Sequence, residues 1–434
     1  MLAKYRLPAG SLAALIVATT VIPPARPVHA SVQPGDVITK TNVDKIEGLV
    51  SPGVEWVVRH GMELTITPYK RISPVPAFQE ATEKYGGQAR INPNNHALEN
   101  WTAGRPFPTI DPNDPQAADK IMYDVDRTQA FTDDQALHLL DAETGQMAAT
   151  GQTPQFDIER HFVIDWLRVL QYSGRTENPP IPAIPNNPDG VFRKTGQYSI
   201  LEPFDLKGVG LLSYRYLDPA KQDDTWLYLP SLRRVRRLSS AERSDALFGQ
   251  DTDLDSYGVY SGQTAWFDWK LLGTRPMLAS LHGENVPPKV CPGDGGATFC
   301  ENWELRPAMY VVEGTPKVKN YAYSKRVIYI DKESFLPMYS DLYDPHGELW
   351  KTVIQNIRTS TKPNPNVSFE YKYPRSFIYG FMVVDMQLNH ATRAAIPGMK
   401  FPNEPGWYVN QGDKYGTNEA FFTLSAMVEA GRGG

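Results

Sequence analysis

Hydrophobic and aromatic residues gather in short runs along the second half of the chain, a pattern typical of β-strands. From Val191 onward the runs are separated by turn residues, so we expect an antiparallel β-meander there. The predicted strands are Tyr198–Glu202, Gly210–Tyr216, Thr225–Leu229, Arg233–Leu238, Arg326–Ile330, Leu336–Tyr343 and Glu348–Gln355.

Helical spacing is confined to the first half of the chain. It predicts one helix over Ala77–Tyr85 and a second from Gln116 to about Arg127, after a proline-containing stop. Phe162–Tyr172 fits a helix or a strand, and its alternation favours a strand. The remainder of residues 31–114 is expected to be irregular. The 37 prolines and 33 glycines argue against long helices.

Several predicted strands are apolar on both faces. Trp226 and Tyr228 point away from Leu227 and Leu229, and Arg326–Ile330 shows the same arrangement. Antiparallel sheets usually leave one face in water, so each face here needs cover from a helix, another sheet or a ligand. Either the protein covers both faces itself or one face lines a cavity. The aromatic candidates for a cavity wall are Trp226, Tyr228, Trp266, Trp269, Tyr329 and Trp350.

The first thirty residues have the features of a cleavable signal peptide. Lys4 and Arg6 precede an apolar run over residues 12–22, and Val28-His-Ala30 offers a cleavage site before Ser31. A bilayer span needs about 20 apolar residues, which favours cleavage over an uncleaved anchor. We therefore expect export to a bacterial periplasm and no transmembrane span in the mature chain.

Charge and cysteine content narrow the function further. The chain has a net charge of −5, and loss of residues 1–30 leaves 41 basic against 49 acidic residues, or −8. An acidic chain is a poor partner for nucleic acid. Cys291 and Cys300 flank a glycine-rich loop and predict a disulfide, which stabilises by about 2–3 kcal/mol. A zinc site is disfavoured because no histidine lies near them.

The densest basic cluster occupies one predicted strand. It consists of Arg233, Arg234, Arg236 and Arg237. Two interpretations stay open: an ion-pair network with acids between residues 223 and 255, or contact with an anionic head group or a partner, for which guanidinium groups are suited.

No local motif for metal binding or catalysis stands out. Asp251-Thr-Asp-Leu-Asp255 is similar to the start of a calcium loop, but Ser256 and Gly262 stand where glycine and glutamate are needed. Turn capping or pairing with arginine is favoured there. The histidines form no zinc motif, and no nucleophile elbow is present. We expect no cofactor, no metal and no enzymatic activity, although a triad built from distant residues stays open.

Six segments carry a resemblance to a known bacterial family. They are Trp101-Thr-Ala-Gly-Arg-Pro-Phe-Pro108, Tyr172-Ser-Gly-Arg-Thr176, Ser213-Tyr-Arg-Tyr-Leu-Asp-Pro219, the stretch 224–238, Gly249-Gln-Asp251 and Tyr343-Asp-Pro-His-Gly347. The chain resembles the domain of unknown function 1329 family, proteins often described as outer-membrane lipoprotein-sorting. The resemblance implies a periplasmic location, peripheral to the outer membrane or free. It also implies a mainly β fold with helices (α+β), similar to LolA and LolB: a large, incomplete antiparallel barrel, covered by helices, around an apolar cavity.

These observations together predict organisation and function. Residues 31–190 should form an N-terminal region with helices and the first strands, packed on a barrel built mostly from residues 191–434. The leading hypothesis is a carrier for a lipid or other hydrophobic molecule, linked to lipoprotein or lipid trafficking. The alternatives are a scaffold docking an envelope transport assembly or outer-membrane protein, and an envelope lipid or glycan hydrolase.

Overall fold

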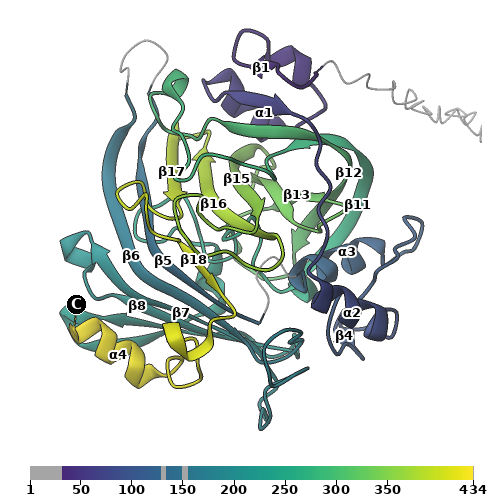
Figure 1. Cartoon of the computed structure of the whole chain (residues 1–434), viewed down its shortest axis with the longest axis vertical. Coiled ribbons are helices and arrows are strands. Elements are labelled where there is room, and N and C mark those ends of the chain that lie inside the picture. The colour runs from purple at the N-terminus through teal and green to yellow at the C-terminus, as the bar shows by residue number, and fades with distance from the viewer. Residues whose placement is uncertain (1–31, 129–132, 149–154, 434) are drawn as a thin grey trace, which may run out of the picture.

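A computed structural model gives the structure of the protein and describes residues 32–128, 133–148 and 155–433 (Figure 1). The predicted signal peptide, residues 1–30, lies outside the described residues. Sixteen strands in the described part of the chain join one large sheet. They are β1 (Val37–Ile38), β2 (Leu64–Thr67), β5 (Asp134–Gln146), β6 (Asp157–Gln171), β7 (Val191–Glu202), β8 (Gly210–Tyr216), β9 (Asp224–Leu229), β10 (Arg234–Leu238), β11 (Phe267–Ala279), β12 (Glu301–Pro316), β13 (Lys325–Asp331), β14 (Pro337–Tyr343), β15 (Leu349–Ser360), β16 (Arg375–Asp385), β17 (His390–Ala395) and β18 (Trp407–Val409).

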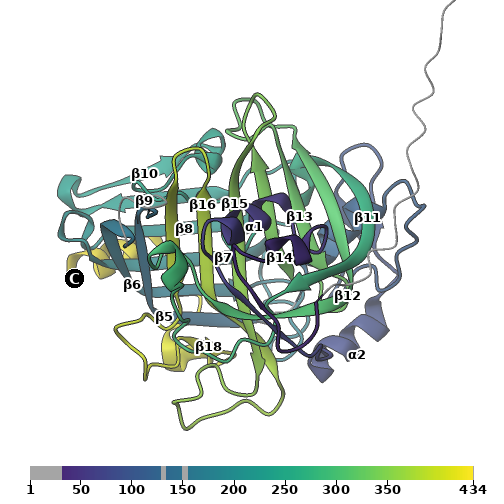
Figure 2. The same cartoon turned by 90° about the horizontal axis from the view of Figure 1, so that it is seen from above.

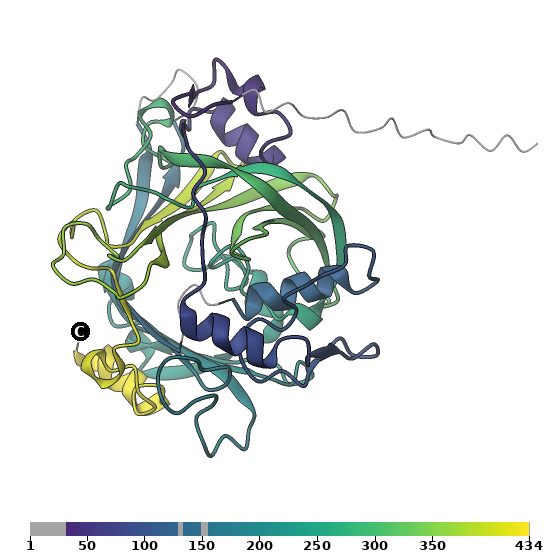
Figure 3. The same ribbon diagram turned by 45° about the vertical axis from the view of Figure 1, so that its right-hand side comes forward.

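The sheet curls into an incomplete barrel, as Figure 3 shows. Its order is β1-β2-β12-β13-β14-β15-β16-β17-β5-β6-β7-β8-β9-β10, with β11 beside β12 and β18 beside β5. Neighbouring strands are antiparallel except β2 and β12, which are parallel. The two ends of this order, β1 and β10, do not pair with each other. The mainly β, open-barrel fold expected from the sequence is thus confirmed.

The helices are short and lie on the surface of the sheet or at its open side (Figures 1 and 2). They are α1 (Pro52–Arg59), α2 (Pro76–Tyr85), α3 (Ala117–Asp126) and α4 (Leu424–Gly433), with 3-10 turns η1 (Val43–Ile46), η2 (Phe204–Leu206), η3 (Pro230–Leu232), η4 (Ser240–Ser244), η5 (Thr264–Trp266), η6 (Pro292–Asp294) and η7 (Gly412–Tyr415). A further pair of strands, β3 (Arg90–Ile91) and β4 (Leu98–Glu99), forms a small separate sheet.

The predicted helices α2 and α3 are confirmed within one residue at each end, and the ambiguous segment 162–172 is strand β6. The sequence analysis missed α1, which lies in a stretch expected to be irregular. Ser51 caps α1 by accepting a hydrogen bond from the Val54 amide, and Pro52 occupies its first turn. Apolar residues of one face, including Val57 and Val58, are fully buried against the sheet.

Both faces of the β12–β16 part of the sheet are covered by the protein itself. Val327 and Tyr329 pack with α1 on one side, whereas Ile328 and Ile330 pack with α3 on the other. The two-faced apolar pattern is therefore confirmed, and side chains fill much of the interior in this half of the barrel, although Pro337, Gln355 and Ile378 line a cavity.

The disulfide between Cys291 and Cys300 is present, with the Cα atoms 4.9 Å apart.

The proposed division near residue 190 stays a prediction about domain organisation. Strands from before and after residue 190 are direct neighbours in the sheet: β6 pairs with β7, and β5 pairs with β17.

Candidate functional site

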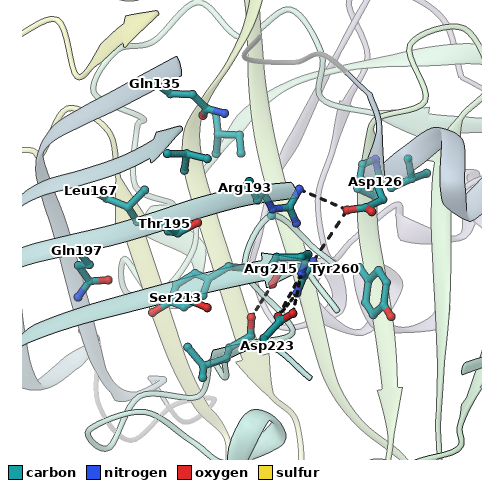
Figure 4. A pocket seen from close by; sticks show the side chains of 18 of the residues that line it. Asp126, Gln135, Leu167, Arg193, Thr195, Gln197, Ser213, Arg215, Asp223 and Tyr260 are labelled. Atoms are coloured by element: carbon teal, nitrogen blue, oxygen red, sulfur yellow. Dashed lines mark hydrogen bonds and ion pairs between the residues drawn. The ribbon is translucent and has the colours of Figure 1, made fainter. Parts of the chain in front are cut away.

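A cavity of about 340 Å³ lies on the inner face of strands β6, β7 and β8 (Figure 4). Alternate residues along a strand point to the same face, so every second residue of these strands contributes to the floor. Cross-strand pairing arranges them in three rows. The first row holds Gln171, Arg193 and Arg215; the second holds Val169, Thr195 and Ser213; the third holds Leu167, Gln197 and Leu211.

The rows form a gradient of polarity along the cavity. The first row is charged, the second carries hydroxyl groups, and the third is mostly apolar. Arg193 and Gln197 lie at the two ends of this gradient on one strand. The two residues are four steps apart along an extended strand, a span of roughly 13 Å.

A smaller pocket of about 20 Å³, lined mostly by apolar side chains, adjoins the cavity beyond its third row. It shares Gln197 and Leu211 with the larger cavity and adds Phe162, Ile164 and Ile200. The apolar lining therefore continues past the floor of the main cavity.

The charged end faces the last turn of α3 and the segment 254–261. Asp126, the last residue of α3, reaches into this end, and Tyr260 lies beside it (Figure 4). Asp126 Oδ1 lies 3.3 Å from Arg193 Nη1 and 3.9 Å from Arg215 Nη1. Its other oxygen accepts a hydrogen bond from Arg127. Burial alone would raise the pKa of Asp126, but the three arginines outweigh it and hold that pKa below its ordinary value.

A second aspartate completes the charged cluster. Asp223 Oδ2 lies 2.8 Å from Arg215 Nη2 and 3.1 Å from Arg243 Nη1. Arg243 Nη2 in turn lies 2.6 Å from Asp255 Oδ1. Burial would raise the pKa of Asp223, but Arg215 and Arg243 lower it further than burial raises it. Asp126 and Asp223 therefore stay ionised and hold the arginines in place.

The six aromatic residues predicted to form a cavity wall lie elsewhere. Trp226 and Tyr228 occupy the outer face of β9, in the apolar cluster that α4 covers. Thr225 of the same strand lines the cavity instead. The faces of β9 were assigned the wrong way round, because apolar character alone cannot show which face a helix covers.

The other four predicted wall residues are also outside the cavity lining. Trp266, Trp269 and Trp350 belong to the cluster packed around α3, and Tyr329 belongs to the cluster under α1. These four side chains are core residues or pack against the core.

The arginine-rich segment forms an exposed edge of the sheet. β10 begins at Arg234, and Arg233 precedes it with a left-handed backbone at φ 50°. Arg237 pairs with Asp224, whereas Asp223 and Asp255, both considered as partners, bind Arg215 and Arg243 instead. β10 ends the sheet, so its outer edge is unpaired within the described residues.

The aspartate run 251–255 is built into the protein interior. Asp251 binds His390, Asp253 accepts hydrogen bonds from Ser256 and Tyr323, and Asp255 binds Arg243. Turn capping accounts for Asp253 and pairing with arginine for Asp255, as expected, whereas Asp251 pairs with a histidine. Across residues 32–128, 133–148 and 155–433, no group of three or more His, Cys, Asp or Glu side chains is arranged to hold a metal ion.

Among the helices that the structure describes, none has the length and apolar character needed to cross a bilayer.

The sequence analysis did not identify the residues that line the cavity. It started the strand that became β7 at Tyr198 and so left out Arg193, Thr195 and Gln197. Polar side chains at every second position, Arg193, Thr195 and Gln197, were the available signal, because they mark one face of a strand as polar.

Comparison with known proteins places the chain in a family. The family described as "Protein of unknown function (DUF1329)" matches residues 37–427. The chain belongs to the DUF1329 family. It is 26% identical over 337 residues to "Uncharacterized protein PA3922" of Pseudomonas aeruginosa, covering 74% of this chain and 69% of the relative.

Two solved structures similar to this DUF1329 chain come from other bacteria. One is a putative outer membrane lipoprotein-sorting protein domain from Vibrio parahaemolyticus, with 18% identity, a TM-score of 0.45, and 72% of this chain and 98% of that chain covered. The other is a DUF1329 family protein from Desulfovibrio piger, with 17% identity, a TM-score of 0.43 and the same coverage.

Proposed function

We propose that this DUF1329 protein binds a lipid or another largely hydrophobic molecule inside its open barrel and carries it through the periplasm. The observation that carries the proposal is the interior cavity over β6, β7 and β8, whose third row and adjoining pocket are mostly apolar. Its volume lies at the lower end of the range of roughly 300–1,000 Å³ typical of small-molecule sites. In the other half of the barrel, side chains pack around α3.

The chemistry of the lining favours binding over catalysis. The described lining contains no histidine or cysteine, and its aspartates are paired with arginines. Ser213, a hydroxyl in the floor, is hydrogen-bonded to Thr225, which cannot act as a base. Such an interior can hold and orient a guest but offers no activated nucleophile.

Mass spectrometry of an organic extract tests the proposal directly. The full chain is produced with its own N-terminus, and the mature protein is purified from the periplasmic fraction without detergent. We expect one lipid class at near-stoichiometric amount. Repeated blank extracts, together with failure of the emptied protein to take up any acyl-chain probe, would refute the carrier role.

A second candidate function, docking to an envelope transport assembly, is favoured by the unpaired edge strand β10. Its exposed arginines and the partly exposed Val235 present both charge and free backbone groups to a partner. A photocrosslinking residue placed at Val235 in cells should give one discrete product. Replacing Arg234 and Arg236 by glutamate should remove that product, and an unchanged or absent product counts against docking here.

A further inference from the structure

The charged end of the cavity carries more positive than negative charge. Four arginines meet there: Arg127, Arg193, Arg215 and Arg243. They pair with three aspartates: Asp126, Asp223 and Asp255. One positive charge is therefore left without a carboxylate. An unpaired charge in a buried site is unfavourable, so the excess marks where a negative group would be stabilised.

Of the four arginines, Arg193 has the weakest interaction with carboxylates. Arg215 and Arg243 each donate hydrogen bonds to carboxylates. The guanidinium of Arg193 makes one ion pair, 3.3 Å from Asp126, and donates no hydrogen bond to any described residue. Its side chain keeps 22% of its surface exposed, and it lines the cavity. Several of its donors thus remain available to a guest.

The electrostatic surroundings of Arg193 point the same way. Burial lowers the pKa of Arg193 to about 10; Asp126 raises it, whereas Arg215 and Arg127 lower it further. The group stays cationic at neutral pH, with two like charges beside it. The Asp126 carboxylate does not prevent an anion from binding at Arg193, because its negative charge is offset by three arginines.

The opposite end of the cavity suits an apolar chain. Leu167 and Leu211 flank Gln197 in the far row of the floor, and Phe162 and Ile164 line the small pocket beyond them. A guest lying along β7 would meet charge first, then Thr195 and Ser213, then apolar surface. This order of environments matches a molecule with a charged head and an oily tail.

We infer that the cavity takes a single-headed anionic amphiphile whose carboxylate or phosphate pairs with the Arg193 guanidinium, with its chain directed toward Leu211 and Phe162. The inference rests on the proposed carrier function and specifies the chemical class of its cargo. Guanidinium groups bind carboxylates and phosphates through paired hydrogen bonds, so both head groups fit the same site.

Binding measurements with matched ligands test this inference. Delipidated mature protein is titrated with dodecanoate, dodecyl phosphate and the neutral 1-dodecanol, and then with acetate and inorganic phosphate as competitors. The variants are Arg193→Gln, Arg193→Lys as the conservative change, and Arg236→Gln as a control on the exposed edge strand. Thermal unfolding of each variant establishes that it is folded.

The expected result is a preference of at least about tenfold for the two anionic ligands over 1-dodecanol. Arg193→Gln should abolish this preference without weakening 1-dodecanol binding, Arg193→Lys should keep part of it, and Arg236→Gln should match the wild type. Equal binding of all three ligands, or no effect of Arg193→Gln, would overturn the inference and leave the carrier function standing. Displacement by acetate or phosphate alone would also overturn it, by showing a site for free anions. If no amphiphile binds at all, the carrier function itself falls.

Discussion

Arg193 and Arg215 lie directly opposite each other on β7 and β8, and Oδ1 of Asp126 bridges the two guanidinium groups at 3.3 and 3.9 Å. Like charges in opposed positions of an antiparallel pair are destabilising. Asp126, at the end of α3, reduces the repulsion between the two guanidinium groups. One carboxylate therefore links the helix to the cavity floor.

Asp126→Asn is predicted to lower the free energy of unfolding by about 3–5 kcal/mol, because it leaves three partly or fully buried arginines without their shared carboxylate. Urea denaturation measures the change. Asp44→Asn serves as the control, since that carboxylate pairs with Arg59 at the surface and should matter by less than about 1 kcal/mol. Equal effects of the two substitutions would contradict the role given to Asp126.

Leu211→Trp is predicted to exclude the cargo, because the larger ring would occupy the apolar end of the cavity. The amount of lipid extracted per protein should fall severalfold, while unfolding by urea shifts little because the added volume enters existing space. Leu388→Trp, at a side chain that is 65% exposed, is the matched control and should keep the wild-type lipid content. Full lipid occupancy in the Leu211 variant would argue that the cargo binds elsewhere.

Tyr228→Ala is predicted to reduce stability but not ligand affinity. The ring is 2% exposed and packs in the cluster that α4 covers, on the face of β9 turned away from the cavity. Truncating a buried aromatic side chain costs about 3–5 kcal/mol. Phe204→Ala, at a ring that is 91% exposed, should leave stability nearly unchanged. Weakened binding of an acyl probe at full stability would restore Tyr228 as a wall residue.

The His390–Asp251 pair is predicted to make stability depend on pH. Nδ1 of His390 lies 2.8 Å from Asp251 Oδ2, and this hydrogen bond, opposed in part by burial, raises the pKa of His390 above its unfolded value of about 6.5. The pair therefore stabilises the fold fully below that unfolded value, and its contribution disappears as pH rises through the higher folded-state pKa.

His390→Gln should accordingly destabilise the protein more at about pH 5 than at about pH 9. Urea denaturation at both pH values measures the difference. His346→Gln, at an exposed turn position, provides the reference. A loss that is the same at both pH values would show that His390 acts by packing alone.

Removing the disulfide is predicted to lower the free energy of unfolding by about 2–3 kcal/mol. The Cys291–Cys300 bond closes a short loop in the cluster under α1, where Cys291 is buried and Cys300 is half-buried. Urea denaturation of the double variant Cys291→Ser and Cys300→Ser, compared with oxidised wild-type protein, measures this contribution, and reduced wild-type protein should match the variant. Since the loop lies away from the cavity lining, lipid content should stay the same.

Local pattern alone determined much of this architecture. Alternation and turn residues place β8, β9 and β13 to within a residue or two, and helical spacing places α2 and α3, because these signals depend on neighbours in the chain. The facing of Val327 and Ile328 to opposite apolar environments follows from the same period. The disulfide was also predictable, since its two cysteines are close in sequence.

Tertiary structure decided which of the two faces holds a cavity. Trp226 and Thr225 are adjacent in sequence, yet α4, from the far end of the chain, covers the first and the cavity receives the second. The ion-pair partners of Arg193 and Arg243 could not be predicted from the sequence either. Asp126, for example, reaches Arg193 from a helix more than sixty residues away in the chain. Periodicity assigns side chains to a face, but only packing between distant segments determines whether that face is filled by protein or left open for a guest.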